Sequence, residues 1–458
     1  MKENKVLYRK VEARIDEFLS SNDGKVLLVT GARQTGKTFI IENVAAKRFK
    51  HFVKIDFYEN KVAKTLFEDA KDAHDILTRI SALGNTELVP GETLIFFDEI
   101  QECRESITLI KYLVQEGSYK YILSGSLLGV ELYNVRSIPV GYMDSIEMFP
   151  LDFEEFALAC GVSAAVLDTI RDSFEKKKEV DGIVHDLMMR LFRLYLVVGG
   201  MPAAVSKYLE TNNIAEVVKI QESIILRYKE DISKYEMDDR KLRIRQIYNL
   251  IPAELNEKNK RFVLRDADRN ARMDRYENSF VWLSNAGAAI PVYNAKEPSV
   301  PLKLNQTATL FKLFLSDVGL LSSMYMDGIQ LRILNNEKDI NFGAVYENVT
   351  AQELKAHGYR NIYYFNSKKQ GEVDFLVDWN GSVLPLEIKS GKDYTVHSAL
   401  TRIMDNPDYQ IPRAFVFSNA NVRVEGKIVY LPMYMLMFIK KETVPDDFVF
   451  KLDISALT

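Results

Sequence analysis

The chain has 458 residues, which is enough for about three domains of ordinary size. Apolar residues make up 47% and charged residues 27%, and this balance excludes a disordered, collagen-like or disulfide-rich chain. The net charge is −4, so any contact with nucleic acid needs a local basic patch rather than the whole surface.

Compartment and targeting signals are sparse. Cys103 and Cys160 lie far apart and fit no metal-ligand spacing, so we expect a reducing compartment without disulfides. The first residues, MKENKVLYRKVEARIDEF, are charged throughout and do not resemble a signal peptide. No apolar run reaches the roughly 18 residues of a membrane helix. We therefore expect a cytoplasmic protein without membrane contact.

A phosphate-binding loop is predicted at residues 31–38. The aliphatic run VLLVT at 26–30 is typical of a buried parallel strand, and GARQTGKT follows it directly, matching G-x-x-x-x-G-K-[ST]. The two glycines permit unusual backbone angles, so that loop amides and the next helix meet the phosphates. The residues assigned to ATP are Gly31, Ala32, Arg33, Gln34, Thr35, Gly36, Lys37 and Thr38. Lys37 would contact the β- and γ-phosphates, and the Thr38 hydroxyl would bind Mg²⁺.

A second buried strand, TLIFFDE at 93–99, ends in two acids. The carboxyl ends of parallel strands share one edge of the sheet, so these acids are expected near the phosphate loop. Asp98 is assigned to Mg²⁺ through water, and Glu99 is assigned as the base that orients the attacking water.

Two more strands are predicted at 51–57 and 119–126. Ser124 and Ser126, at the end of the second, are placed where a polar group senses the γ-phosphate. A plain turn explains either serine nearly as well.

The middle of the chain divides into a helical part and a basic part. Residues 150–240 alternate apolar and charged groups at helical spacing, which predicts a lid of helices over the nucleotide. Residues 240–275 hold eleven basic and five acidic residues, a local charge of +6. Two interpretations of this patch are about equally well supported. It contacts DNA or RNA phosphates, or it is a solvated face with local ion pairs.

The C-terminal third contains an acid-rich hairpin at 371–391, GEVDFLVDWNGSVLPLEIKSG. The Asn-Gly pair at 380–381 predicts a tight turn between two strands, which would bring Asp374 toward Glu387 and Lys389. Two carboxylates bind a hard cation such as Mg²⁺, and a lysine beside them stabilises charge at phosphorus.

The motifs GARQTGKT, IFFDEIQEC, ILSGS, MFPLDFEEF, GGMPAAV and FKLFLSDVGLL occur in this order. Together they resemble a family of prokaryotic AAA+ superfamily ATPases with a C-terminal domain of unknown function. The acid-rich hairpin, with Glu347 on a preceding helix, resembles the PD-(D/E)xK nucleases, which implies metal ligation by Glu347, Asp374 and Glu387 and catalysis by Asp374, Glu387 and Lys389.

The resemblance implies an α/β fold class: a P-loop AAA+ parallel sheet with a helical lid, a winged-helix-like middle segment and a C-terminal α/β restriction-endonuclease-like domain. The expected domains are 1–150 (nucleotide binding), 151–240 (lid), 241–325 (winged-helix-like) and 326–458 (nuclease-like). The chain departs from the family at its arginines. The segment MPAAVSKYL has none, and Gly141–Tyr142 stands where family members often have Gly-Arg. Arg136 is the nearest candidate finger, although a solvated loop arginine explains it better, and both a homo-oligomer and a monomer stay open.

Two hypotheses on function follow. The first is an ATPase, with ATP and Mg²⁺ as cofactors, whose nucleotide state positions a nuclease-like domain acting on DNA or RNA. The second is a nucleotide-gated binding protein whose C-terminal domain recognises protein or nucleic acid without cleaving it. A small-molecule kinase is disfavoured by the chain length and by the pair Asp98–Glu99, which suits water activation.

Overall fold

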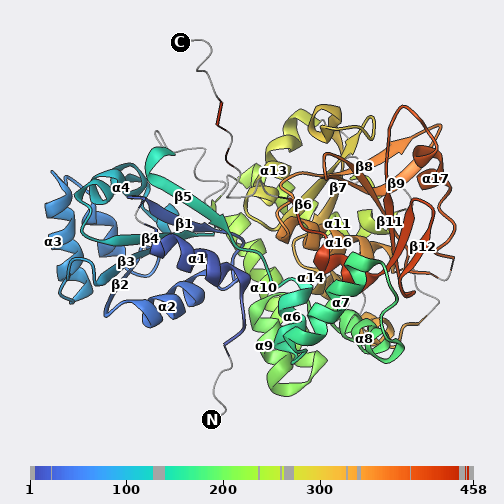
Figure 1. The fold of residues 1–458 in the computed structure, drawn as a ribbon. Coiled ribbons are helices and arrows are strands. Elements are labelled where there is room, and N and C mark those ends of the chain that lie inside the picture. The colour runs from blue at the N-terminus through green and yellow to red at the C-terminus, as the bar shows by residue number, and fades with distance from the viewer. Residues whose placement is uncertain are drawn as a thin grey trace.

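The computed structural model has two lobes, an N-terminal sheet domain and a larger part formed by the rest of the chain (Figure 1). The structure describes residues 6–21, 23–126, 140–235, 238–257, 260–262, 273–325, 328–337, 342–391, 393–442, 449 and 451–452. Among the described residues, neither Cys103 nor Cys160 forms a disulfide bond. In the described residues, no helix is both long enough and apolar enough to cross a membrane.

The N-terminal lobe is a five-stranded parallel sheet in the order β2-β3-β4-β1-β5. Its strands are near-continuous apolar runs because helices bury both faces. Helices α1 and α2 pack on one face, and α3 and α4 pack on the other. The elements are α1 (Lys10–Ser20), β1 (Val26–Thr30), α2 (Lys37–Arg48), β2 (His51–Asp56), η1 (Lys61–Leu66), α3 (Ala73–Gly84), β3 (Thr93–Asp98), η2 (Ile100–Glu102), α4 (Arg104–Glu116), β4 (Lys120–Gly125), η4 (Val140–Tyr142) and β5 (Met143–Glu147).

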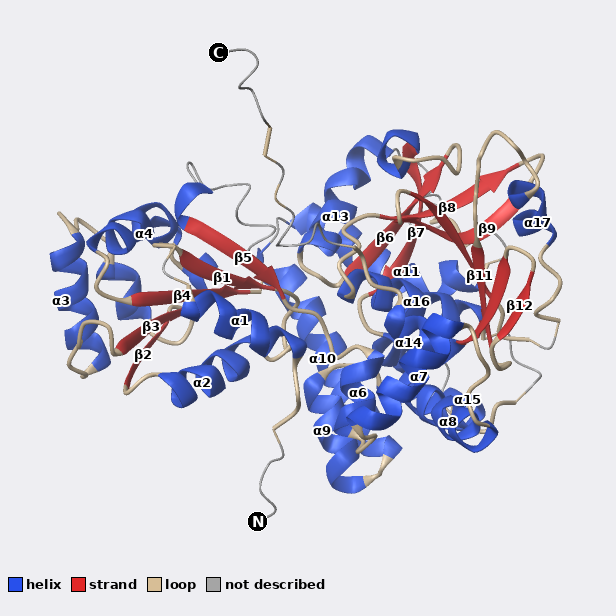
Figure 2. Ribbon diagram, in the orientation of Figure 1, coloured by secondary structure: helices blue, strands red, loops and turns tan. Residues whose placement is uncertain are grey.

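The middle of the chain is helical, as its apolar spacing predicts. These helices share one continuous hydrophobic core with the C-terminal sheet, whereas the N-terminal sheet has two cores of its own. Figure 2 shows the helices α6, α8, α9 and α10 gathered below and between the two sheets. They are α6 (Phe153–Ala159), α7 (Ala164–Lys176), α8 (Gly182–Val198), α9 (Pro202–Thr211), α10 (Ile214–Tyr235), α11 (Asp238–Asn256) and α13 (Met273–Asn285).

The C-terminal part is a mixed eight-stranded sheet in the order β12-β13-β11-β10-β9-β8-β6-β7. Helix α16 packs on one face and α17 on the other. The elements are β6 (Ala289–Ala295), η5 (Leu302–Asn305), β7 (Gln306–Leu315), α14 (Val318–Met324), α15 (Ile329–Leu334), α16 (Gly343–Ala356), β8 (Ile362–Ser367), β9 (Gly371–Trp379), β10 (Ser382–Ile388), α17 (Ser398–Met404), β11 (Ala414–Ser418), β12 (Arg423–Glu425), β13 (Ile428–Pro432) and η6 (Met433–Phe438).

Strands β6 and β7 join the C-terminal sheet across the domain boundary expected at 325–326. β6 pairs parallel with β8, and β7 pairs antiparallel with β6 at the edge of the sheet. The segment expected to be winged-helix-like therefore contributes two strands to the sheet of the domain that follows it. The predicted hairpin of β9 and β10 is confirmed, and both turn residues, Asn380 and Gly381, have the positive φ (46° and 70°) that this turn needs.

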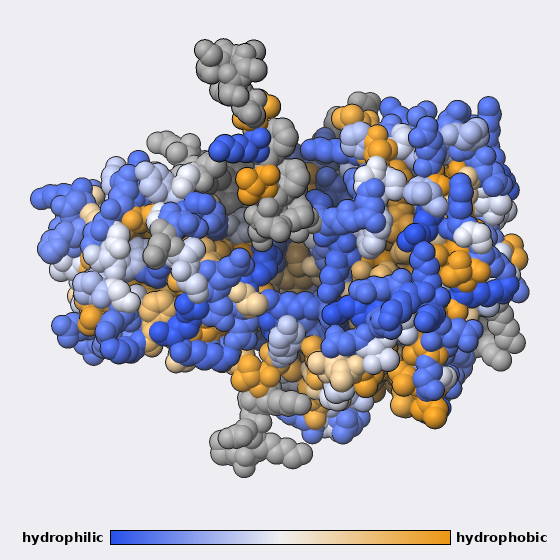
Figure 3. All heavy atoms as spheres, viewed as in Figure 1, coloured by the Kyte–Doolittle hydropathy of each residue, from blue (hydrophilic) through white to orange (hydrophobic). Residues whose placement is uncertain are grey.

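The face shown in Figure 3 is mostly polar, with apolar side chains gathered near its lower right edge. The large exposed apolar residues of the contacting helices α8 and α15 are Ile183, Leu187 and Leu331.

Candidate nucleotide site and carboxylate pocket

The loop between β1 and α2 has two glycine positions that no other residue fits well. A Cβ atom on Gly31 would lie 2.1 Å from the carbonyl oxygen of Met148, the residue that follows β5. Gly36 has φ of 91° and directly precedes α2. The backbone therefore needs glycine at both ends of the loop, as the sequence motif predicts.

The Lys37 side chain turns back over the loop. Its Nζ donates to the carbonyl oxygens of Gly31, at 3.1 Å, and Ala32, at 2.9 Å. Burial lowers the pKa of Lys37 from 10.5 to about 8, although the charges of Glu99 and Asp98 act in the opposite direction. The loop thus holds a buried ammonium group with no direct carboxylate partner among the described residues, a group suited to an incoming polyanion.

Nucleotide affinity is expected to fall as pH rises above about 8, because free Lys37 then loses its proton. A bound triphosphate stabilises the ammonium form, so binding above this pH takes up a proton, and the affinity falls up to about tenfold per pH unit. The measurement is the dissociation constant of an ATP analogue across this range. A Lys37→Arg variant that still binds should lose this dependence, because arginine stays charged. A wild-type affinity that does not change with pH would contradict the prediction.

Asp98 ends β3 beside the phosphate loop, as predicted. The Thr38 Oγ1 donates to Asp98 Oδ2 at 2.8 Å, and Ser124 Oγ donates to the other carboxylate oxygen. Lys54 Nζ lies 3.5 Å from Asp98 Oδ2. Strand β4 stands between β1 and β3 in the sheet, which brings Ser124 between the loop and the acid. A hydroxyl and a buried carboxylate at this spacing fit the oxygen ligands that Mg²⁺ takes.

Glu99 follows β3 with a left-handed backbone, at φ of 50°. Such a conformation costs a non-glycine residue about 1 kcal/mol and is typical of functional turns. Its Oε2 accepts hydrogen bonds from Gln101 Nε2 and, at 3.1 Å, from Ser126 Oγ. The turn and these two donors hold the carboxylate at the edge of the sheet where the loop lies.

Other contacts with the loop come from segments that the sequence did not single out. From α10, Asp231 forms an ion pair with Arg33, and the Tyr228 hydroxyl donates to the Arg33 carbonyl at 3.0 Å. Arg33 therefore points toward the helical part of the chain. From the segment before α1, Arg9 Nη1 donates to the Thr35 carbonyl at 3.0 Å. Arg136 lies outside the described residues.

A second group of predicted residues meets in a pocket of about 370 Å³ at one face of the C-terminal sheet. Its polar lining comes from α16, β9, β10 and the segments at 260 and 388–393. The predicted residues Glu347, Asp374, Glu387 and Lys389 all line it. The structure therefore brings together residues that the sequence separates by up to 42 positions.

Two lysines that the sequence analysis did not assign to this site neutralise Glu347. Lys260 forms an ion pair with one carboxylate oxygen, and the Nζ of Lys312, on β7, lies 3.3 Å from the other. Lys312 also pairs with Glu372 at 2.7 Å. Burial alone would raise the pKa of Glu347, but Lys312 and Lys260 lower it, so this carboxylate stays charged.

The pKa values of Asp374 and Glu387 are shifted in the opposite direction from that of Glu347. Burial, together with Glu387 and Glu347, raises the pKa of Asp374 well above its usual value, and Asp374 Oδ2 accepts from the Ile388 amide at 2.8 Å. Burial likewise raises the pKa of Glu387, although its ion pair with Lys389, at 2.8 Å, lowers it. Among the residues that the structure describes, Glu387 Oε2 is buried without a hydrogen-bond partner.

These features fit a cation only in part. The buried Glu387 Oε2 and the raised pKa of Asp374 fit a site that a positive charge would stabilise. Glu347, however, already has its charge balanced. Within the described ranges, no group of three or more histidine, cysteine, aspartate or glutamate side chains has the arrangement of a metal site. Glu347 as a third metal ligand thus stays a prediction.

The basic patch is only partly described. Lys260 faces the pocket rather than the solvent, and Arg243 lies over the ring of Tyr276, 5.8 Å from its centre. Its residues outside the described part are Lys258, Arg265, Arg269 and Arg272. Contact of this patch with nucleic acid stays a prediction.

Three family models match consecutive parts of the chain. Residues 23–157 match an AAA domain, residues 189–334 match a domain of unknown function (DUF8612), and residues 342–436 match another (DUF4143). The AAA match contains the phosphate loop, Asp98 and Glu99. No curated protein matched the chain.

Solved structures give weaker similarities. PCH-2 of C. elegans has 14% identity and a TM-score of 0.29, over 50% of this chain and 71% of that one. The ORC1 protein of Aeropyrum pernix, solved in complex with DNA, has 12% identity and a TM-score of 0.32, over 72% of this chain and 95% of that one. Both TM-scores are low, so neither similarity bears on function. The chain thus contains a segment, residues 23–157, that matches an AAA domain, followed by two segments that match domains of unknown function.

Proposed function

We propose that the N-terminal domain binds and hydrolyses ATP with Mg²⁺. The loop amides and the Lys37 ammonium would hold the phosphates, and Thr38 and Asp98 would hold the metal ion, Asp98 through water. Bound Mg²⁺ would neutralise charge on the phosphate oxygens as the terminal bond breaks. The observation that carries this proposal is the bond between Thr38 Oγ1 and Asp98 Oδ2 at 2.8 Å, because it joins the two predicted metal-binding groups beside the buried ammonium.

Hydrolysis, rather than transfer to another substrate, is supported by Glu99. A carboxylate next to the metal-binding acid can accept a proton from water as that water attacks the γ-phosphate. The bonds from Gln101 and Ser126 orient this carboxylate before substrate binds. We infer that Ser124, bonded to Asp98, responds to the terminal phosphate through that acid.

A Glu99→Gln variant is expected to bind ATP with unchanged affinity and to hydrolyse it at least about 100-fold more slowly, since the amide cannot take up a proton. The measurement is turnover of ATP alongside the dissociation constant of a non-hydrolysable analogue. Glu105→Gln, at an exposed glutamate in the first turn of α4, is the matched control and should keep full turnover. Equal turnover in Glu99→Gln would remove Glu99 from the mechanism.

We propose further that nucleotide state controls the C-terminal carboxylate pocket, and that this pocket acts on nucleic acid. The convergence of Asp374, Glu387 and Lys389 supports metal-assisted cleavage of a phosphodiester. The ion pairs of Glu347 with Lys260 and Lys312 favour the second candidate, which is recognition of nucleic acid or protein without cleavage.

Cleavage assays on single- and double-stranded DNA and RNA, with Mg²⁺ or Mn²⁺, separate the two candidates. For the nuclease, Asp374→Ala and Glu387→Ala should each lose cutting while ATP turnover stays intact, because the two sites lie in different domains. Lys427→Ala, at an exposed lysine between β12 and β13, is the control and should leave cutting unchanged. Binding without cutting under every metal would support the second candidate.

A further inference from the structure

Arg9 is a buried arginine at the point where three parts of the chain meet. It lies directly before α1 and is only 6% exposed. Its guanidinium donates to the carbonyl of Thr35 at 3.0 Å, to the carbonyl of Phe149 at 2.6 Å and to the carboxylate of Glu155 at 3.2 Å. One side chain thus joins the phosphate loop, the segment after β5 and helix α6.

The bond to Thr35 has a direct consequence for the loop. A trans peptide unit is planar, so its carbonyl and its N–H point in opposite directions. When Arg9 holds the Thr35 carbonyl, the Gly36 N–H of the same peptide unit must point away from Arg9. Loop amides of this kind are the groups that bind phosphate. Arg9 therefore sets the direction of an amide in the proposed nucleotide site.

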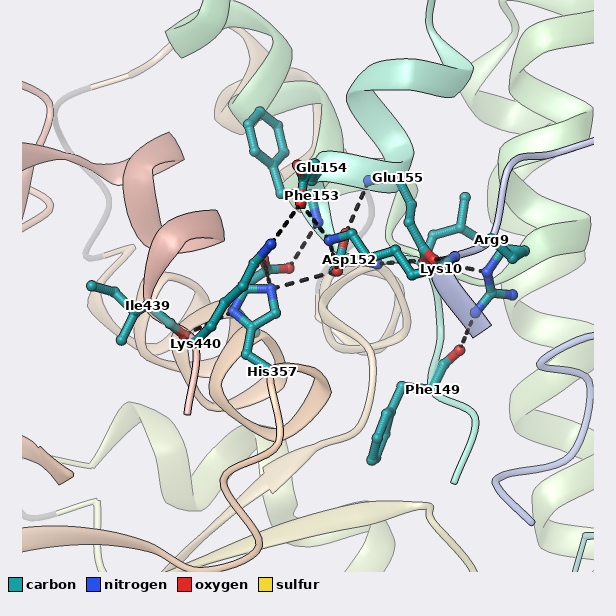
Figure 4. Close-up of polar contacts among 12 residues, drawn as sticks. Arg9, Lys10, Phe149, Asp152, Phe153, Glu154, Glu155, His357, Ile439 and Lys440 are labelled. Carbon is teal, nitrogen blue, oxygen red and sulfur yellow. Dashed lines mark hydrogen bonds and ion pairs between the residues drawn. The ribbon is translucent and has the colours of Figure 1, made fainter. Parts of the chain in front are cut away.

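On its other side, Arg9 is tied to the start of α6. Glu155 and Asp152 form a capping box there, and Glu155 also accepts from the Lys10 amide at 2.6 Å. The Lys10 ammonium lies 2.5 Å from Asp152 and 2.6 Å from Glu154. Figure 4 shows Arg9 and Lys10 on one side of these acids and His357 on the other. We call Arg9, Lys10, Asp152, Glu155, Glu353 and His357 the junction.

The junction continues into helix α16. His357 Nε2 lies 3.5 Å from Asp152 Oδ2, and the Glu353 carboxylate accepts from the Phe153 amide at 2.9 Å and from the Tyr195 hydroxyl at 3.1 Å. Burial would raise the pKa of Asp152, but Lys10 and His357 hold it well below its ordinary value, so Asp152 stays charged. Charge and hydrogen bonds thus connect α6 to the last turn of α16.

Helix α16 carries both Glu353 of the junction and Glu347 of the carboxylate pocket. Its polar side chains are buried and bonded: Asn348 accepts from the Leu315 amide at 2.8 Å, and Gln352 accepts from the Val318 amide at 2.8 Å. These bonds fix α16 to the last residue of β7 and to the first residue of α14, so a shift at its last turn is expected to move the helix as a unit together with them. Glu347 lies about two turns of helix from Glu353.

We propose that Arg9 is a positioning residue for the nucleotide site and that the junction transmits a change in the phosphate loop to α16 and its Glu347. The inference rests on the proposed function, since it needs nucleotide at the loop. Occupancy of the loop changes the Thr35–Gly36 peptide unit, Arg9 follows through its carbonyl contact, and α6 and α16 follow through Glu155 and Asp152.

The first test compares nucleotide binding and turnover in Arg9→Ala, Arg9→Lys and the control Arg14→Ala, an exposed arginine in α1. Arg9→Ala should weaken binding of a non-hydrolysable ATP analogue about tenfold, because the loop amide loses its charge-assisted support. Turnover at saturation should change much less, since the contact acts on bound substrate and transition state alike. Arg9→Lys keeps the charge and should recover part of the affinity.

A purely structural role for Arg9 predicts a different result, namely fewer active molecules with unchanged affinity. Wild-type protein that fails to bind the analogue would overturn the proposed function. If wild-type protein binds the analogue and Arg9→Ala binds it equally tightly, the role of Arg9 is overturned and the proposed function is not.

The second test follows amide hydrogen exchange of residues 343–356 with and without the analogue. In wild-type protein, the analogue should change exchange in this helix. In Glu155→Gln, which weakens the Arg9 contact at α6 and leaves the phosphate loop untouched, this response should be lost while the analogue still binds. An α16 that does not respond in wild-type protein, or that responds equally in Glu155→Gln, would overturn transmission through the junction.

Discussion

Lys37→Met is expected to abolish nucleotide binding and, at the same time, to stabilise the ligand-free protein. Methionine keeps the length and apolar stem of lysine but removes the ammonium group that the loop buries. Without that charge, the loop amides alone face several phosphate charges, so we expect ATP turnover to fall below detection. Binding is measured with a labelled ATP analogue, and Lys47→Met, at an exposed lysine in the last turn of α2, is the control.

The gain in stability follows from the lowered pKa. A shift from 10.5 to about 8 corresponds to about 3 kcal/mol of unfavourable free energy for keeping Lys37 charged in the folded state. The folded-state pKa lies below the unfolded-state value, so the unfolded chain binds more protons between these two pH values. The unfavourable free energy of the charged Lys37 is fully present below pH 8 and disappears as pH rises toward 10.5.

Thermal unfolding, followed by circular dichroism at neutral and alkaline pH, checks this prediction. The advantage of Lys37→Met over wild-type protein should be largest at neutral pH and should shrink as pH rises. A variant that binds ATP as tightly as wild-type protein would refute the assignment of the phosphate loop. A variant less stable than wild-type protein at neutral pH would refute the electrostatic account.

Lys312→Met is expected to lower the free energy of unfolding by about 3 kcal/mol or more. Lys312 is fully buried on β7 and balances the charges of Glu347 and Glu372. Removing one partner of a buried ion pair leaves the other charge without compensation, which costs far more than replacing both partners. Glu347 keeps Lys260, but its second carboxylate oxygen loses its partner.

Tryptophan fluorescence follows unfolding of the part of the chain that contains Lys312. The two tryptophans are Trp282, in α13, and Trp379, at the end of β9. Urea unfolding should shift strongly for Lys312→Met and little for the control Lys303→Met, at an exposed lysine in η5. Adding Glu347→Gln to Lys312→Met should restore much of the stability, since the uncompensated charge is then gone.

The pH dependence gives a separate check. Lys312 and Lys260 lower the folded-state pKa of Glu347 in wild-type protein, so the stability from this carboxylate is present above the unfolded-state pKa of 4.5 and is lost as pH falls through the lower, folded-state value. In Lys312→Met, Glu347 can take up a proton more readily. The difference in the free energy of unfolding between this variant and wild-type protein should therefore become smaller in acid. A difference independent of pH would point to packing rather than charge.

The phosphate loop and its acids could be placed from the sequence because their geometry is local. The spacing of Gly31 and Gly36 specifies a turn that few other structures need, and a buried parallel strand must deliver Asp98 to the edge of the sheet where the loop lies. The Asn380–Gly381 turn similarly determines the hairpin that brings Asp374 toward Glu387. In each case, the residues that decide the geometry are neighbours in the chain or lie at the ends of strands of one sheet.

What the sequence could not show depends on contacts between distant segments. Arg9 and Thr35 are 26 positions apart and Arg9 and Glu155 are 146 apart, and no periodicity marks a lone arginine before a helix as a group that holds a loop carbonyl. The same holds for Lys312, which reads locally as a charged residue in a strand and became a buried counter-ion only when β7 packed beside α16.

The amino-acid sequence by itself thus determined the parallel sheet, the phosphate loop, the acids at the end of β3 and the turn of the C-terminal hairpin, because short-range sterics and short apolar runs specify them. The tertiary structure alone decided that β6 and β7 complete the C-terminal sheet and that two lysines balance Glu347. It also decided that one arginine joins the loop to the helices beyond it. The physical reason is that burial and ion pairing between distant segments depend on which surfaces meet, and local pattern does not encode that choice.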